Sequence, residues 1–294
     1  MRRPFVSVVA AALLATVVAA CGRGEDDAPP VATPSLTLSR PDAAIGSPME
    51  MTYRFAVAPD APAIAEDYWV FVHFLDADGE LMWTDDHQPP TPTRQWKPGS
   101  TIEYTRTMFV PKFPYVGETR IQAGLYARSS GDRLPLAAES VGQRAYQLAT
   151  FTMCLQSDNI FVVFRDGWHE TETGEDGSGV EWQWSKKDAT LSFRNPKRDI
   201  LFYLEADQPV TALTEPQRVE LRLGTEVVDS FALASGQREL RRVPISAAAL
   251  GQAETVELTI SVDRTFVPAS VPALRSIDPR ELGVRVFRAF VQPK

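Results

Sequence analysis

An all-β fold of two antiparallel β-sandwich domains is predicted by three features of this sequence. The chain of 294 residues contains 23 prolines and 17 glycines, a density that favours many short elements joined by turns. Apolar and polar residues alternate with a period of two in one segment after another, as in strands with one buried face. A helical period is limited to two short stretches near the C-terminus, so long helices are not expected.

The composition narrows the class of protein further. With 44% hydrophobic residues the chain can bury a core, and its 38 acidic and 30 basic side chains give a formal charge of −8. That charge argues against a nucleic-acid partner bound by a basic face. Three His and two Cys exclude a disulfide scaffold, an iron–sulfur protein and a Cys-rich zinc module. We therefore expect no cofactor and no metal.

The first twenty residues are predicted to be an export signal. Arg2 and Arg3 form a short basic start, and residues 5–18 form an apolar run that is too short to span a bilayer comfortably. The run ends in Val18-Ala19-Ala20-Cys21, which resembles the lipobox of bacterial lipoproteins. The resemblance implies cleavage before Cys21 and attachment of acyl chains such as palmitate to its sulfur. The alternative is an ordinary signal peptide cut after Ala20, with Cys21 incidental.

The lipobox implies a location in the cell envelope, on a membrane that the protein binds through its lipid. Two or three acyl chains hold a protein on a bilayer without a spanning helix. Gly22 stands where lipoproteins retained in the inner membrane usually carry Asp. In a Gram-negative cell this favours the outer membrane, with the body facing the periplasm or the cell surface.

Residues 21–34 are polar and rich in proline, which predicts a disordered tether. A first sandwich is predicted over residues 35–156. Its strands are expected at residues 49–57, 68–75, 81–83, 102–110, 120–126 and 145–153. Asp76-Ala77-Asp78-Gly79 predicts a hairpin turn. Short antiparallel strands in this number indicate an immunoglobulin-like architecture, although the Cys and Trp spacing of antibody domains is absent.

A second sandwich is predicted over residues 157–294, with the strand pattern of a jelly roll. Its strands are expected at residues 180–184, 189–193, 200–204, 218–223, 227–233, 239–245, 255–262 and 284–291. Two helical turns are expected, at residues 246–250 and 278–283. The second has Asp278 as cap, Pro279 in the first turn, Glu281 three residues after the cap and Gly283 at its end.

This second half resembles non-catalytic β-sandwich modules of bacterial cell-surface and glycosyltransferase proteins. The resemblance is carried by four short motifs: Gly167-Trp168, Glu181-Trp182-Gln183-Trp184 with Ala189-Thr190-Leu191, Pro216-Gln217-Arg218-Val219, and Asp278-Pro279-Arg280-Glu281-Leu282-Gly283. It implies a carbohydrate-binding-like sandwich and names no ligand.

The densest group of candidate binding residues is Trp168, His169, Trp182 and Trp184. Flat indole faces could stack on a sugar ring, but Trp182 and Trp184 share a strand face and could equally be core residues. Glycosidases need two carboxylates on either side of a sugar. Glu170, Glu172 and Glu181 are the candidates for such a pair, and a polar loop that includes residues 175–179 is the alternative.

Other chemical groups are more readily explained as structural. His73 lies in an apolar segment, and we expect a hydrogen-bonded histidine there rather than a metal ligand. Asp85, Asp86 and His87 could bind a cation, but adjacent residues of an extended segment point in opposite directions. A calcium loop beginning at Asp76 fails because His87 occupies its twelfth position.

Cys154 has apolar neighbours and is expected to be a core thiol, and Asp278 with Arg280 is expected to be a local surface pair. The sequence also lacks the common motifs of hydrolases, nucleotide-binding proteins and metalloproteases. The leading hypothesis is therefore a non-catalytic module of the envelope that binds a glycan or an envelope partner. The alternatives are an envelope scaffold or assembly protein and, less favoured, an enzyme acting on glycosides through the Glu170–Glu181 region.

Overall fold

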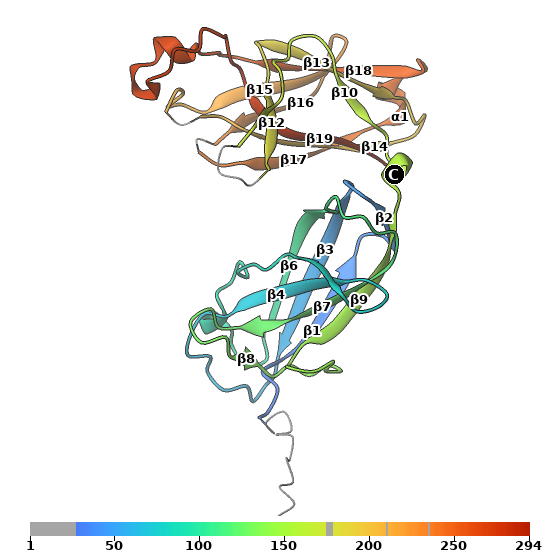
Figure 1. Ribbon diagram of the computed structural model, residues 1–294, viewed down its shortest axis with the longest axis vertical. Coiled ribbons are helices and arrows are strands. Elements are labelled where there is room, and N and C mark those ends of the chain that lie inside the picture. The colour runs from blue at the N-terminus through green and yellow to red at the C-terminus, as the bar shows by residue number, and fades with distance from the viewer. Residues whose placement is uncertain (1–27, 175–178, 210, 235) are drawn as a thin grey trace, which may run out of the picture. The chain divides into compact units, whose positions relative to one another are not determined.

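The computed structural model describes residues 28–174, 179–209, 211–234 and 236–294 (Figure 1). Within them the predicted fold class is confirmed: the chain is all-β, and its sheets are built mainly from antiparallel strands. The predicted lipobox residues, Cys21 included, lie outside the described residues. None of the helices in the described part is both long and apolar enough to cross a bilayer.

Two compact units are distinguished by their internal contacts. The first contains Thr52–Arg106 and Arg120–Ala149 together with the described residues up to Thr37. The second contains Leu38–Met51, Thr107–Thr119 and Thr150–Lys294. The predicted domain boundary between residues 156 and 157 stays a prediction.

The N-terminal strands form two sheets, of order β1-β3-β6 and β2-β9-β7-β4-β5, with β8 paired to β7. Most pairs are antiparallel, whereas β2 runs parallel to β9. The strands are β1 (Ala32–Leu38), β2 (Asp42–Ala44), β3 (Pro48–Val57), β4 (Trp69–Leu75), β5 (Leu81–Thr84), β6 (Thr101–Phe109), β7 (Gly117–Tyr126), β8 (Arg133–Leu134) and β9 (Tyr146–Cys154). Short 3-10 turns lie at η1 (Thr93–Gln95) and η2 (Gln156–Asp158).

Alternation along the N-terminal strands produces the buried face. Val72 of β4 pairs with Ala123 of β7, and Phe74 pairs with Ile121, and all four side chains are at most 1% exposed. The neighbouring side chains point to the other face of β4, where Phe71 is also buried at 2% exposed. The nearly continuous apolar run of residues 68–75 predicts such a strand, buried on both faces, whereas the period of two predicts the single buried face of a strand such as β3.

The C-terminal strands also form two sheets, of order β10-β13-β18-β15-β16 and β11-β12-β19-β14-β17, which Figure 1 shows stacked on each other. The strands are β10 (Val162–Phe164), β11 (Glu172–Thr173), β12 (Glu181–Trp184), β13 (Asp188–Arg194), β14 (Ile200–Asp207), β15 (Gln217–Leu223), β16 (Glu226–Leu233), β17 (Glu239–Ile245), β18 (Thr255–Val262) and β19 (Arg285–Pro293). The helical elements are α1 (Ala247–Leu250), η3 (Pro268–Ser270) and η4 (Pro272–Leu274). We call this pair of sheets the C-terminal sandwich.

Inward-facing side chains of both sheets form one apolar core in the C-terminal sandwich. Leu191 and Leu258 come from one sheet and Phe202 and Leu204 from the other, and each is fully buried. At about 25 cal/mol per Å² of apolar surface removed from water, this burial is the main stabilising contribution to the sandwich. The outward faces of both sheets are consequently free to carry polar and aromatic side chains.

Two of the predicted turns are confirmed. The Asp76 carboxylate accepts hydrogen bonds from the backbone N–H groups of Asp78 and Glu80 at 2.9 and 2.8 Å, and Gly79 has φ +85°, so β4 turns directly into β5. The predicted helical turn at residues 246–250 is α1, and the Ser246 hydroxyl caps it by accepting a bond from the Ala249 N–H.

Two sequence predictions differ from the structure. Residues 278–283 form no helix: the Asp278 carboxylate accepts the Arg280 N–H two residues on, a local bond that competes with a helical cap. The segment is extended instead, and Leu282 forms a bridge with Phe266. In addition, β1 begins at Ala32, inside the segment predicted as tether.

Candidate functional site

The four aromatic and histidine residues predicted as a site are divided between two packing environments. Trp168 packs against the main core of the C-terminal sandwich, and its Nε1–H donates to the Thr190 carbonyl at 2.9 Å. Its ring also meets Phe164 edge-on, with centroids 4.7 Å apart. Trp168 therefore anchors the start of the domain to β13.

Trp182 and Trp184 occupy alternate positions of β12, and Trp184 pairs with Arg285 of β19. Their side chains therefore lie on the outer face of this sheet. Trp184 is covered there: it is 7% exposed and packs with Phe266 and Leu282 in a small second core. Trp182 lies at the edge of this core and stays partly exposed. Of the two indoles, Trp182 is the one that faces solvent.

His169 connects β12 with the loop that precedes β19. Its Nε2–H donates to the Glu281 carbonyl at 2.8 Å, and its own carbonyl accepts a bond from the Gln183 amide at 3.0 Å. The imidazole is thereby directed toward backbone rather than toward a ligand. Its place in the structure is to hold the loop beside the Trp182 strand.

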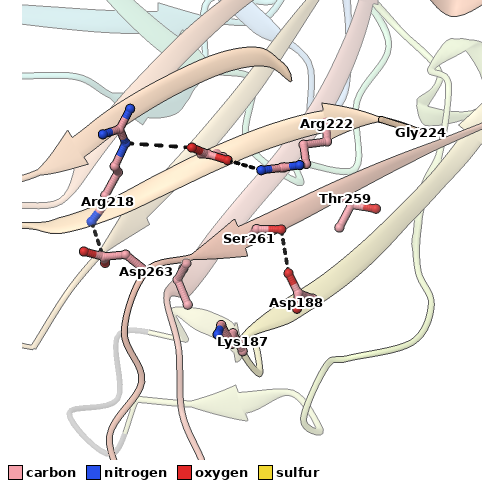
Figure 2. Close-up of a pocket in the computed structure, with 10 residues that line it drawn as sticks. Lys187, Asp188, Arg218, Arg222, Gly224, Thr259, Ser261 and Asp263 are labelled. Carbon is pink, nitrogen blue, oxygen red and sulfur yellow. Dashed lines mark hydrogen bonds and ion pairs between the residues drawn. The ribbon is translucent and has the colours of Figure 1, made fainter. Parts of the chain in front are cut away.

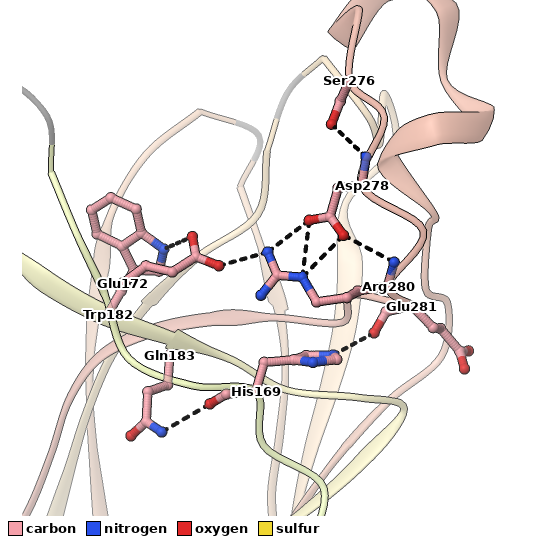
Figure 3. Close-up of polar contacts among 8 residues, drawn as sticks. All are labelled: His169, Glu172, Trp182, Gln183, Ser276, Asp278, Arg280 and Glu281. Carbon is pink, nitrogen blue, oxygen red and sulfur yellow. Dashed lines mark hydrogen bonds and ion pairs between the residues drawn. The ribbon is translucent and has the colours of Figure 1, made fainter.

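A polar network fixes the surroundings of Trp182 (Figure 3). The Trp182 Nε1–H donates to Glu172 Oε2 at 3.0 Å, and Arg280 Nη2 donates to Glu172 Oε1 at 2.7 Å. Arg280 also pairs with Asp278 through Nε and Nη2. These hydrogen bonds lower the pKa of Asp278 and raise that of Arg280, so both groups stay charged and the indole is held in one orientation.

Beside Trp182, the outer face carries Arg285 and Phe287 of β19. The Arg285 guanidinium lies 5.3 Å from the Trp182 ring and 5.0 Å from the Phe287 ring, within cation–π range. The Arg238 guanidinium also lies against Phe287, 3.6 Å from the ring centroid. We call the surface formed by Trp182, Arg238, Arg285 and Phe287, with Glu172 and Arg280 at its edge, the Trp182 face.

A β-bulge interrupts the pairing of β19 at Phe287. The register between β14 and β19 shifts between Glu205 and Ala206, so that Glu205 pairs with Arg288 while Ala206 pairs with Val286. Phe287 is the extra residue and stands next to Arg285 on the outer face. Arg285 and Phe287 are two residues apart and share this face by strand alternation alone, while the bulge shifts the pairing of the residues that follow. Sequence reasoning missed Arg238, Arg285 and Phe287, and the alternation of Arg285 and Phe287 in the last strand was the one available signal.

The candidate catalytic carboxylates are not brought together. In the antiparallel pair of β11 and β12, Glu172 is opposite Trp182 and Thr173 is opposite Glu181. Paired residues point to the same side, so Glu172 and Glu181 extend from opposite faces of the sheet. Glu170 is exposed, and residues 175–178 of the predicted polar loop lie outside the described residues.

The other candidate groups are satisfied by neighbouring protein atoms. His87 is 5% exposed and contacts the Asp85 carbonyl through Nδ1 and the Tyr104 hydroxyl through Nε2. The Asp85 carboxylate binds Arg106, and Asp86 accepts the Val72 N–H. Among the described residues no group of His, Cys, Asp and Glu side chains is arranged to hold a metal ion.

His73 and Cys154 are each partly buried. Burial lowers the pKa of the His73 imidazole and raises that of the Cys154 thiol. Both shifts favour the neutral form of the side chain. For Cys154, a thiol that resists ionisation is a poor nucleophile.

The chain matches no protein-family model. No curated protein matches it either. Many solved structures are similar to this chain in part of their backbone, and three of them illustrate the similarity. One is the Pseudomonas fluorescens alkylpurine DNA glycosylase AlkC bound to DNA containing an abasic site analogue, with 9% identity and a TM-score of 0.27 over 43% of this chain and 31% of that chain. Another is the N-terminal CBM22-1–CBM22-2 tandem domain of Paenibacillus barcinonensis Xyn10C, with 11% identity and a TM-score of 0.26 over 85% of this chain and 79% of that chain. The third is a glycoside hydrolase family 43 arabinoxylan arabinofuranohydrolase from Bacillus subtilis in complex with cellotetraose, with 9% identity and a TM-score of 0.25 over 89% of this chain and 54% of that chain. At these TM-scores the similarities assign no function.

Proposed function

We propose that this protein is an exported, lipid-anchored envelope lipoprotein whose C-terminal sandwich binds glycans without catalysis. The observation that carries the proposal is the partly exposed Trp182 indole, which donates a hydrogen bond to the Glu172 carboxylate and lies 5.3 Å from the Arg285 guanidinium. A sugar ring has an apolar C–H face and an edge of hydroxyls. Binding sites for such ligands combine an aromatic surface with a few fixed polar groups.

The fixed orientation of Trp182 supports binding rather than packing alone. Its Nε1–H is engaged by Glu172, and Glu172 is itself held by Arg280, so the indole face is ordered before a ligand arrives. Ordering in advance reduces the entropy lost on binding. The small core around Trp184 packs against the same strand on the same outer face.

The arrangement of carboxylates supports a non-catalytic role. A glycosidase places two carboxyl groups about 5 to 10 Å apart on either side of the scissile bond. Glu172 and Glu181 leave opposite faces of their sheet, and both oxygens of Glu172 are already hydrogen-bonded. The glycoside-active enzyme is therefore the weaker alternative, and hydrolysis lost in Glu181→Gln would restore it.

The test is glycan-array screening of the full chain, followed by calorimetry with Trp182→Ala and with Phe161→Ala as a matched control. Phe161 is 58% exposed and lies outside the Trp182 face. We expect wild type and Phe161→Ala to bind alike, and Trp182→Ala to bind at least tenfold more weakly while its circular dichroism spectrum shows that it remains folded. Equal binding by Trp182→Ala would reject this face as the site.

The alternative function is an envelope scaffold or assembly protein. If the wild-type chain binds no glycan while a pull-down from envelope extract returns a protein in stoichiometric amount, this alternative replaces glycan binding. The lipid anchor has its own test. We expect Cys21→Ala to lose acylation and membrane association, and a variant that is processed and retained as wild type would reject the anchor.

A further inference from the structure

The sheet of the C-terminal sandwich that does not carry the Trp182 face, of order β10-β13-β18-β15-β16, has a groove on its outer face. The groove has a volume of about 510 Å³, within the range of roughly 300 to 1,000 Å³ typical of small-ligand sites. It is formed by β13, β18 and β15 (Figure 2). Its principal lining residues are Asp188, Arg218, Glu220, Arg222, Thr259 and Ser261.

The groove exists because the central strand carries short side chains. In the sheet order, β18 lies between β13 and β15, and its outward residues here are Thr259 and Ser261. Thr259 is paired with Arg222, and Ser261 is paired with Glu220. Two hydroxyl side chains therefore form a floor, and long charged side chains of the adjacent strand form a wall.

The polar groups of the groove are ordered by contacts with one another. Glu220 lies between two arginines of its own strand, with Arg222 Nη2 at 2.5 Å and Arg218 Nε at 3.9 Å from its carboxylate oxygens. The Ser261 hydroxyl donates to Asp188 Oδ1 at 2.6 Å. A ligand would meet donors and acceptors that are already positioned, which lowers the entropic cost of binding.

The charges in the groove determine the class of ligand. Lys187, Arg218 and Arg222 are balanced by Asp188, Glu220 and Asp263, so the lining has no net formal charge. For an anion or a cation, attraction to the three groups of opposite charge is offset by repulsion from the three groups of like charge. A neutral ligand with many hydroxyls, each able to donate and accept, satisfies both kinds of group at once.

We propose that this groove is a second glycan-binding site, which takes a neutral oligosaccharide along β18. The proposal rests on the proposed function for the class of ligand, and extends binding from one sheet face to both. Two sites on one domain would raise the avidity for a polymeric glycan that reaches both. A soluble tetrasaccharide would occupy them independently.

The test is a titration of the ¹⁵N-labelled full chain with three neutral tetrasaccharides: cellotetraose, maltotetraose and tetra-N-acetylchitotetraose. We expect one of them to shift the amide signals of Thr259, Ser261 and Gly224, and to do so equally in Trp182→Ala. Arg222→Ala should lower the affinity that these shifts report at least tenfold. Arg198→Ala, an exposed arginine outside the groove, is the matched control and should leave them unchanged.

The two sites are distinguished by their signals. Shifts confined to the Trp182 indole N–H would overturn the second site and leave the proposed function intact. Shifts confined to the groove would support the second site and reject the Trp182 face. No shift with any neutral tetrasaccharide would reject both sites, and preferential binding of tetragalacturonate in the groove would overturn the neutral class of ligand.

Ser261→Trp provides a second test, because the larger side chain fills the floor of the groove. Groove shifts that persist in this variant would also overturn the assignment.

Discussion

The guanidinium of Arg285 and the carboxylate of Asp207 form two parallel hydrogen bonds, Nε to Oδ1 at 2.8 Å and Nη2 to Oδ2 at 2.7 Å. The two residues are directly opposite each other in the β14–β19 pair. The same guanidinium lies 5.0 to 5.4 Å from the rings of Trp182, Trp184 and Phe287. Asp207 therefore determines where the central cation of the Trp182 face is placed.

We predict that Asp207→Asn destabilises the C-terminal sandwich by about 2 kcal/mol, because a partly buried arginine loses its counter-charge. The Arg285 and Asp207 side chains are 28% and 12% exposed. Urea unfolding followed by tryptophan fluorescence measures the change. Glu254→Gln is the control: Glu254 pairs with Lys197 but is 91% exposed, so its loss should change the free energy of unfolding by at most about 0.5 kcal/mol. Equal effects would show that Asp207 stabilises no more than a surface pair.

Gly167 is predicted to be irreplaceable even by alanine. It has φ +84°, and a Cβ atom there would lie 2.1 Å from the Asp188 carbonyl oxygen. Both the backbone conformation and the missing space oppose a side chain. We expect Gly167→Ala to lower the free energy of unfolding by more than about 3 kcal/mol, or to prevent folding of the C-terminal sandwich.

Gly224→Ala separates the two causes. Gly224 has φ +58°, but a Cβ atom there would meet no atom within 4 Å. We expect a loss of about 1 kcal/mol from the left-handed conformation alone. Thermal melts of both variants, read by far-ultraviolet circular dichroism, provide the comparison, and similar losses would contradict a steric role for Asp188.

His87 is predicted to make the two sheets of the N-terminal strands sensitive to mild acid. Burial lowers the pKa of its imidazole below the ordinary 6.5, whereas the unfolded chain keeps the ordinary value. Above that value both states are neutral and the folded state is fully stable. As the pH falls through about 6.5 the unfolded state takes up the proton first, so stability decreases until the pH reaches the folded-state pKa.

Melting curves from pH 8 to pH 5 test this prediction. We expect His87→Gln to be less stable than wild type at pH 8, where the bond to Tyr104 is lost, and to show a shallower fall below pH 6.5. His73 acts in the same direction, because burial also lowers its pKa, so His73→Gln with His87→Gln should flatten the profile further. An unchanged slope in the double variant would place the acid sensitivity elsewhere.

Local sequence patterns predicted most of the strands and two turns correctly, because these elements depend on alternation and on nearby hydrogen bonds. The hairpin at Asp76 and the cap at Ser246 are both formed within a few residues. The prediction of a helical turn at residues 278–283 was wrong because its local signals are opposed by side-chain contacts, one of them with a distant strand. Its cap, Pro, Glu and Gly fit a helix locally, yet the Asp278 carboxylate binds Arg280, and Arg280 is held by Glu172 from a distant strand.

By itself, the sequence determined that the chain folds as antiparallel sandwiches and that Trp182 and Trp184 share one strand face. Both follow from the period of two, which each segment carries alone. The tertiary structure decided which indole is covered and which faces solvent, because that depends on where residues 266–282 fold over β12. It also decided that Arg285 and Phe287 lie beside Trp182 and that short residues of β18 leave a groove. These features arise from pairing between segments far apart in the chain, and no local pattern specifies that pairing.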